Sequence, residues 1–68
     1  MRDSIREIKK MYPKGTRVEL VFMDDKFAPP VGTKGTVNHV DDIGTVHISW
    51  DSGSGLGVCL ERDVIRKI

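Results

Sequence analysis

The 68-residue sequence has a single cysteine, Cys59, and no closely spaced Cys and His residues of the kind that bind zinc. An internal disulfide and a structural zinc site, which commonly support very small domains, are therefore not expected. No apolar stretch approaches the length of a membrane span, and the charged N-terminal segment differs from a secretory signal. We expect a cytoplasmic protein that does not bind membranes, which also suits a single reduced thiol.

Charge of one sign is also scarce, because the formal net charge is only +1. The charges are unevenly distributed along the chain. Residues 1–20 contain six Lys or Arg and three acidic residues, whereas residues 21–60 contain two Lys or Arg and five acidic residues. The sequence therefore predicts a basic patch near the N-terminus beside a more acidic remainder.

The N-terminal segment has the pattern of a short helix. Ile5 and Ile8 recur at helical spacing, and Ser4 with Glu7 forms the S-x-x-E pattern of a capping box. Pro13 restricts the residue before it to extended geometry, so the helix should end at residue 11 or 12. A chain of this length forms one domain, and we expect it to consist of a helix within residues 1–12 and a β-domain over residues 13–68.

After residue 16 the apolar period changes to two, which indicates strands. Val18, Leu20 and Phe22 share one face of the first strand, and Trp50 shares the inner face of a later one. Residues 23–35 contain two prolines and two glycines and are expected to form a long irregular loop. Residues 41–44 are expected to form a tight turn. The predicted strands are residues 16–22, 35–40, 45–50, 56–60 and 64–68.

The glycine run in "SWDSGSGLG", residues 49–57, raises the question of a phosphate-binding loop. Such loops lead into a helix, yet Leu56, Val58 and Leu60 repeat at a spacing of two, as in a strand. We therefore expect a hairpin. Aligning the inner faces of its two strands places Val46 opposite Leu60, Ile48 opposite Val58 and Trp50 opposite Leu56.

Five short strands, a long first loop and one helical turn at residues 61–64 predict a mainly β fold. The expected architecture is a small five-stranded, partly open SH3-like barrel with a short N-terminal α-helix. An OB-fold is the alternative, although it usually needs a longer chain.

Three segments resemble the family called domain of unknown function 4314, found in bacteria and mobile elements. They are "KGTRVELVFMDD", "PVGTKGTV" and "DDIGTVHISWDSGSGLG", and the resemblance covers residues 12–60. It implies an SH3-like fold and no assigned activity. More distantly, "GTRV" followed by "GTKGTV" is similar to the KOW motif of ribosomal and transcription-elongation proteins.

Candidate catalytic and metal-binding groups are few. The strand alignment places His47 opposite Cys59, but two ligands do not make a zinc site. The acidic residues of the central region lie in turns, where carboxylates usually accept hydrogen bonds from backbone N–H groups. We therefore expect no enzymatic activity, no metal and no cofactor. The turn carboxylates are Asp24, Asp25, Asp41, Asp42 and Asp51.

We expect the chain to bind another protein. Tyr12 and Phe27 are the candidate anchors, whereas Phe22 and Trp50 are assigned to the core. Basic residues near the N-terminus would steer an acidic partner, and an uncovered Ile face on the helix would drive self-association. The basic candidates are Arg6, Lys9, Lys10, Lys14 and Arg17.

Nucleic-acid binding is the alternative function. The same basic residues would follow a phosphate backbone, and Tyr12 or Phe27 would stack on bases. The two functions differ in their salt dependence, because binding to phosphates weakens steeply as salt is added.

Overall fold

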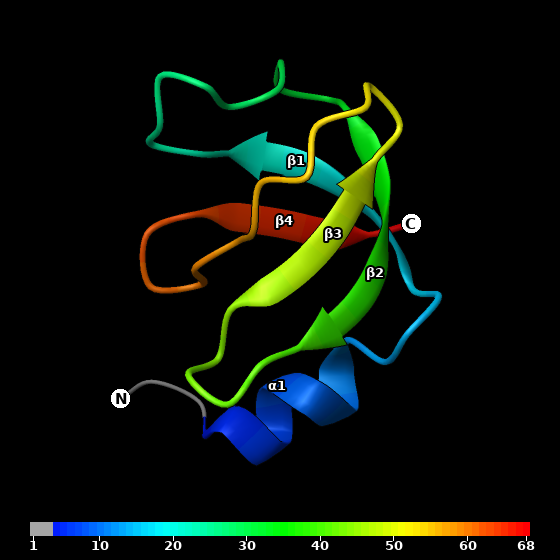
Figure 1. The fold of residues 1–68 in the computed structure, drawn as a ribbon, viewed down its shortest axis with the longest axis vertical. Coiled ribbons are helices and arrows are strands. Elements are labelled where there is room, and N and C mark those ends of the chain that lie inside the picture. The colour runs from blue at the N-terminus through cyan, green and yellow to red at the C-terminus, as the bar shows by residue number, and fades with distance from the viewer. Residues whose placement is uncertain (1–3) are drawn as a thin grey trace.

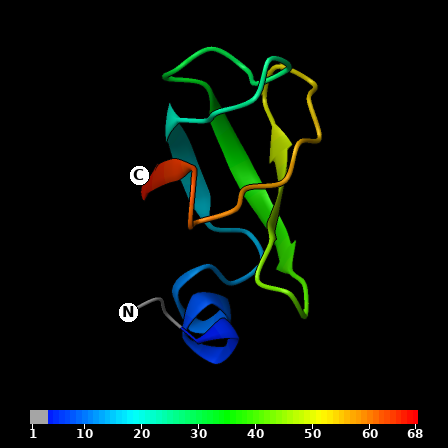
Figure 2. The same cartoon turned by 90° about the vertical axis from the view of Figure 1, so that its left-hand side faces the viewer.

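A computed structural model describes residues 4–68 and shows one helix and four strands. The elements are α1 (Ile5–Met11), β1 (Arg17–Phe22), β2 (Lys34–Val40), β3 (Val46–Trp50) and β4 (Val64–Lys67). The strands form one antiparallel sheet in the order β3-β2-β1-β4, which curls so that its two halves face each other (Figures 1 and 2). The chain is therefore mainly β. No helix in this part of the chain is long and apolar enough to cross a membrane.

The helix begins and ends where the sequence predicts. The Ser4 hydroxyl accepts a hydrogen bond from the backbone N–H of Glu7, at 3.2 Å, and so caps the first turn. At the other end the Tyr12 N–H donates to the Ile8 carbonyl, and Pro13 follows. The part of the predicted segment 1–12 that precedes Ser4 lies outside the described residues.

A β-bulge in β2 brings two valines to the same face. Val37 pairs with Ile48 and His39 pairs with His47, so Asn38 is an extra residue on β2. The bulge turns Asn38 and His39 outward and returns Val40 to the core beside Val37. The spacing of three between these valines is the sequence signal for this bulge.

A second bulge lies at the end of β1, and it makes the core assignment of Phe22 wrong. Leu20 pairs with Ile65 and Phe22 pairs with Val64, so Val21 is extra on β1. Val21 and Phe22 both turn outward, and Phe22 is 51% exposed. The strict alternation that places Phe22 beside Leu20 fails because a bulge shifts the pattern by one residue.

Residues 56–60 do not form the predicted fifth strand, and the predicted hairpin register is also wrong. Val58 pairs with Val46 in a single bridge, instead of Leu60 with Val46. The 51–57 segment leaves the sheet early, because the Trp50 N–H donates to the Ser54 carbonyl and its indole N–H donates to the Leu56 carbonyl. The chain nevertheless bends without a helix, as expected, and Gly53 takes a positive φ of 96°.

A tight turn over residues 59–63 leads into β4, close to the helical turn predicted there. The N–H groups of Arg62 and Asp63 both donate to the Cys59 carbonyl. The Asp63 carboxylate is buried and accepts hydrogen bonds from the N–H groups of Cys59, at 3.0 Å, and Asp24, at 3.4 Å. A buried carboxyl group is tolerated here because these donors satisfy its oxygens. Asp63 thus connects the long loop to the turn before β4.

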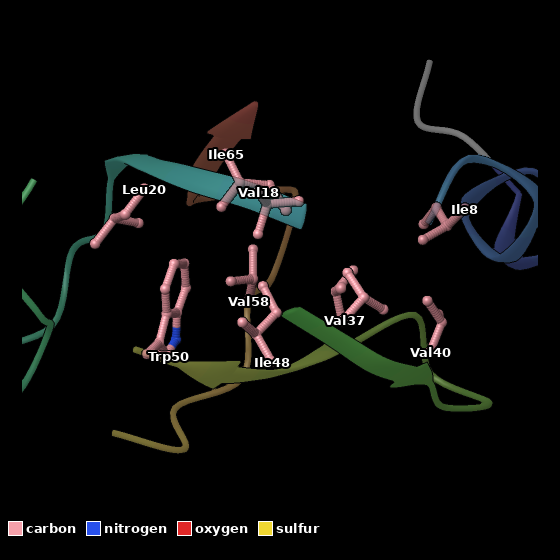
Figure 3. Close-up of a cluster of buried hydrophobic side chains, with 10 residues drawn as sticks. Ile8, Val18, Leu20, Val37, Val40, Ile48, Trp50, Val58 and Ile65 are labelled. Atoms are coloured by element: carbon pink, nitrogen blue, oxygen red, sulfur yellow. The ribbon is translucent and has the colours of Figure 1, made fainter. Parts of the chain in front are cut away.

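The core lies between the two halves of the curled sheet (Figure 3). Leu20 and Trp50 close one end, and Ile8 meets Val40 at the other. Trp50 is buried as predicted. The buried apolar residues are Ile8, Val18, Leu20, Val37, Val40, Val46, Ile48, Trp50, Val58 and Ile65.

The helix rests on the turn between β2 and β3. Gly44 takes a positive φ of 88° in this turn, and a side chain there would meet Ile5 and Ile8. Ile8 is buried, whereas Ile5 remains partly exposed. The Ile8 part of the apolar helix face is therefore covered by its own domain, and the Ile5 part is not.

Gly35 allows the close approach of β2 and β3, and it supplies a first prediction. A Cβ at this position would lie 2.6 Å from Ile48 Cγ2 and 2.9 Å from Trp50 Cε3. We expect Gly35→Ala to lower the free energy of unfolding by about 1–3 kcal/mol, because overpacking displaces these side chains. Urea unfolding measures the change. Gly55→Ala is the control, since no neighbouring atom lies within 4 Å of its Cβ; equal effects of the two variants would contradict the packing described.

Candidate functional site

Two of the predicted basic residues are engaged in ion pairs. The Arg17 guanidinium binds the Asp51 carboxylate through two hydrogen bonds of 2.9 and 2.8 Å, and it also donates to the Thr36 hydroxyl. The hydrogen bonds from Arg17 lower the pKa of Asp51. Lys9 contacts Asp42 at 3.2 Å. These two cations are largely compensated within the chain.

Arg6, Lys10 and Lys14 are exposed and have no acidic partner among residues 4–68. Arg6 and Lys10, together with Ile5 and Lys9, line a shallow hollow on the surface of α1. Lys14 lies in the turn that follows the helix. The basic patch predicted near the N-terminus is therefore present at the α1 end, with fewer unpaired cations than the sequence alone indicates.

The two predicted aromatic anchors lie at opposite ends of the molecule. Tyr12 follows α1, packs against the core, and has the Lys67 ammonium 5.4 Å from its ring. Phe27 is in the long loop between β1 and β2, which lies at the end of the sheet away from α1 (Figure 1). It is 72% exposed, with the Lys26 ammonium 5.1 Å from its ring. One compact partner surface cannot be centred on both aromatics.

The outer face of the sheet carries polar side chains that satisfy one another. The Asn38 amide donates to the Ser49 hydroxyl at 2.9 Å, and that hydroxyl donates back at 3.2 Å. The His39 and His47 rings stack with centroids 4.4 Å apart. Because Asn38 and Ser49 bond each other, their donors and acceptors are already used within the chain.

The expected pairing of His47 with Cys59 is wrong. His47 lies opposite His39 and bonds Asp41, whereas the N–H of Cys59 donates to Asp63. The shift follows from the Val46–Val58 bridge, which moves the 56–60 segment by two residues relative to the expected register. Residues 4–68 contain no cluster of three or more His, Cys, Asp or Glu side chains arranged to bind a metal.

Asp41 organises the turn between β2 and β3. One carboxylate oxygen accepts hydrogen bonds from the N–H groups of Ile43 and Thr45, and the other lies 2.8 Å from Nε2 of His47. The hydrogen bond with His47 is the main reason that the pKa of Asp41 lies below its ordinary value of 3.8. Asp25 similarly accepts a bond from the Phe27 N–H. These contacts agree with the structural role expected of the turn carboxylates.

Exposed apolar side chains come from the end of β1 and from the loop that follows it, and we call this group the loop-end patch. It consists of Val21, Phe22, Phe27 and Val31, bordered by Val64 of β4. The Gly32 N–H donates to the Leu20 carbonyl at 2.8 Å, which holds Val31 beside the end of β1. Val31 is 71% exposed and Val64 is 48% exposed.

This patch includes Phe27 from the predicted site, while Val21, Phe22 and Val31 were not predicted as partner-binding residues. The exposure of Phe22 cannot be predicted from the alternating pattern, because it depends on the bulge at Val21. Val31 gives no signal of its own, since a valine in a loop of unknown path can be buried or exposed.

The fold and these surfaces define a small mainly β domain with one helix and an exposed apolar patch. Residues 1–68 match the family described as "Domain of unknown function (DUF4314)", and the chain belongs to this family. The resemblance of the three motifs is thereby confirmed. Neither a search of curated proteins nor one of solved structures finds a match.

The Asp41 contacts predict a pH dependence of stability. Because folding lowers the pKa of Asp41, its contribution is present above the ordinary value of 3.8 and is lost as the pH falls below it. We expect Asp41→Asn to be less stable than wild type at about pH 7, with the difference shrinking at about pH 3. Urea unfolding at both pH values measures this.

Asp42→Asn is the control, because the Asp42 side chain is 99% exposed and, among residues 4–68, forms an ion pair with Lys9 alone. It should change stability little at either pH. A deficit of Asp41→Asn that is equally large at both pH values would contradict the charged Asp41 contacts.

Proposed function

We propose that this domain is a non-enzymatic interaction module of the bacterial cytoplasm that binds another protein through the loop-end patch. The observation that carries the proposal is the exposure of Phe22, Phe27 and Val31 around one strand end, between 51% and 72%. Large apolar side chains exposed at one end of a small domain are typical of a protein-binding site. Aromatic residues are the usual anchors at such sites.

We also propose that the fold is a partly open SH3-like barrel. The single bridge between Val46 and Val58 supports this reading, because it brings the segment before β4 against the β3 edge. In such a barrel, residues 56–60 take the place of the fifth strand while forming only one pair of ladder hydrogen bonds, of 2.9 and 2.8 Å. The long loop between β1 and β2 then lies at the barrel rim, where SH3-like folds bind extended peptides.

The basic α1 end has a supporting role in this proposal. Arg6, Lys10 and Lys14 are uncompensated by described acidic residues, and they face solvent. Charges of this kind raise the rate at which an acidic partner associates more than they raise its final affinity. Tyr12 contributes to the core at this end, so the anchoring role falls to Phe27 with Phe22 and Val31.

Nucleic-acid binding remains the second candidate function, favoured by the same three cations together with Lys67 over the Tyr12 ring. The ion pairs of Lys9 and Arg17 count against it, because they reduce the charge that a phosphate backbone would meet. The outer sheet face has stacked histidines, and its exposed Phe22 lies at the end of β1 opposite the apolar Val64, which also favours a protein partner.

Substitution within the loop-end patch tests the proposal. Phe27→Ser combined with Val31→Ser should leave the fold intact, because both side chains are more than 70% exposed. We expect a protein captured from bacterial extract by the wild-type domain, then purified, to bind the double variant at least about tenfold more weakly. Titration calorimetry with the purified partner measures this.

Ile43→Ser is the matched control, since Ile43 is 83% exposed at the α1 end of the molecule. This variant should bind as the wild type does. Retained binding by the double variant contradicts the proposal. Binding to unrelated oligonucleotides that weakens steeply with salt, and that Lys10→Ala reduces, would support the second candidate function instead.

A further inference from the structure

The two edges of the sheet differ in how the chain covers them. The β3 edge is covered at both of its ends, because Val46 exchanges two hydrogen bonds with Val58 and the Trp50 N–H donates to the Ser54 carbonyl. The β4 edge lies at the other side of the sheet. Edge strands that keep unpaired backbone groups can pair with another strand.

One hydrogen bond fixes which backbone groups of β4 point away from the sheet. The Ile68 N–H donates to the Arg17 carbonyl, so residues 66 and 68 point their backbone groups toward β1. Ile65 and Lys67 therefore point theirs toward the outer edge. No hydrogen bond joins these outward groups to any other residue within 4–68.

The side chains on the outer face of β4 suit a second strand of the same sequence. Val64, Arg66 and Ile68 alternate onto this face, and the two apolar residues are 48% and 52% exposed. Phe22 of β1 lies opposite Val64 and extends the apolar row. Arg66 Nε donates to Glu19 Oε1 at 2.6 Å, so its charge is compensated within the chain.

We infer that two copies of this chain associate by antiparallel pairing of their β4 edges, about a two-fold axis at Arg66. Ile65 then exchanges backbone hydrogen bonds with Lys67 of the second copy. In the same register Val64 faces Ile68 of the second copy, which brings exposed apolar side chains together. The two sheets continue into one another across the axis.

In this register, the strand that pairs with the β4 edge is the β4 of a second copy of the chain. The pairing about residue 66 is self-complementary, since each Val64 meets an Ile68 and each Ile68 meets a Val64. The two Arg66 side chains face each other at the axis, and each is bound to the Glu19 of its own chain, which limits their repulsion. The contact is small, so we expect a dissociation constant on the order of 100 μM.

This association differs from the expected self-association through the helix, whose Ile8 is buried by its own domain. It also goes beyond the proposed binding of another protein. Phe27 and Val31 of the loop-end patch lie in the loop and not on the β4 edge, so the two proposals can fail separately. Substitution of Phe27 and Val31 should leave the dimer unchanged.

Sedimentation equilibrium over a concentration series from about 10 μM to about 1 mM tests the dimer. We expect a monomer-dimer equilibrium in the wild type. Lys67→Pro removes an N–H that faces the outer edge, a position where proline is tolerated, and it should raise the dissociation constant at least tenfold. Lys67→Ala keeps the N–H and should dimerise as the wild type does.

Amide hydrogen exchange locates the contact. We expect the Ile65 and Lys67 amides of the wild type to exchange more slowly as concentration rises, whereas the Arg66 and Ile68 amides are slow throughout. If Lys67→Pro does not fold, Ile68→Asp replaces it, because a carboxylate would then face Val64 of the second copy. A monomer at all concentrations, or a dimer that these variants leave intact, overturns the inference.

Discussion

The β-bulge at the end of β1 decides which apolar side chains this small domain buries and which it presents to solvent. Val21 is the extra residue, and its insertion turns Phe22 away from the core that Leu20 enters. The core therefore ends at Leu20 and Trp50 on this side of the sheet. A domain of this size has a thin core, so an aromatic side chain that stays at the surface removes a substantial share of the apolar area that could be buried.

The bulge in β2 has the opposite effect, because Asn38 returns Val40 to the core. Val40 packs against Ile8 of the helix, so the bulge in β2 helps to hold α1 against the sheet. As a result of the two bulges, the two ends of the molecule differ in which side chains they expose. The α1 end is basic and exposes Ile43 and part of Ile5, while the loop end exposes a larger group of apolar side chains. This difference between the two ends is the reason that we propose the loop end as the protein-binding surface.

Much of the fold can be predicted from the sequence because local signals agree with each other. Ser4 and Pro13 bound the helix, and the alternation around Val18 and Ile48 gives the strands and their inner faces. The errors share one cause. The assignment of Phe22 and the register that joined His47 to Cys59 both assumed uninterrupted alternation, which bulges and early-leaving loops break. The position of Val31 depends on tertiary hydrogen bonds and has no local signal.

The outward position of Phe22 is the claim on which the loop-end patch depends, and urea unfolding of Phe22→Ser beside Leu20→Ala tests it most directly. The account predicts that Phe22→Ser costs about 1 kcal/mol or less, since half of the side chain is already in solvent. Leu20→Ala should cost about 2–5 kcal/mol. A loss for Phe22→Ser as large as that for Leu20→Ala would place Phe22 in the core and contradict the account.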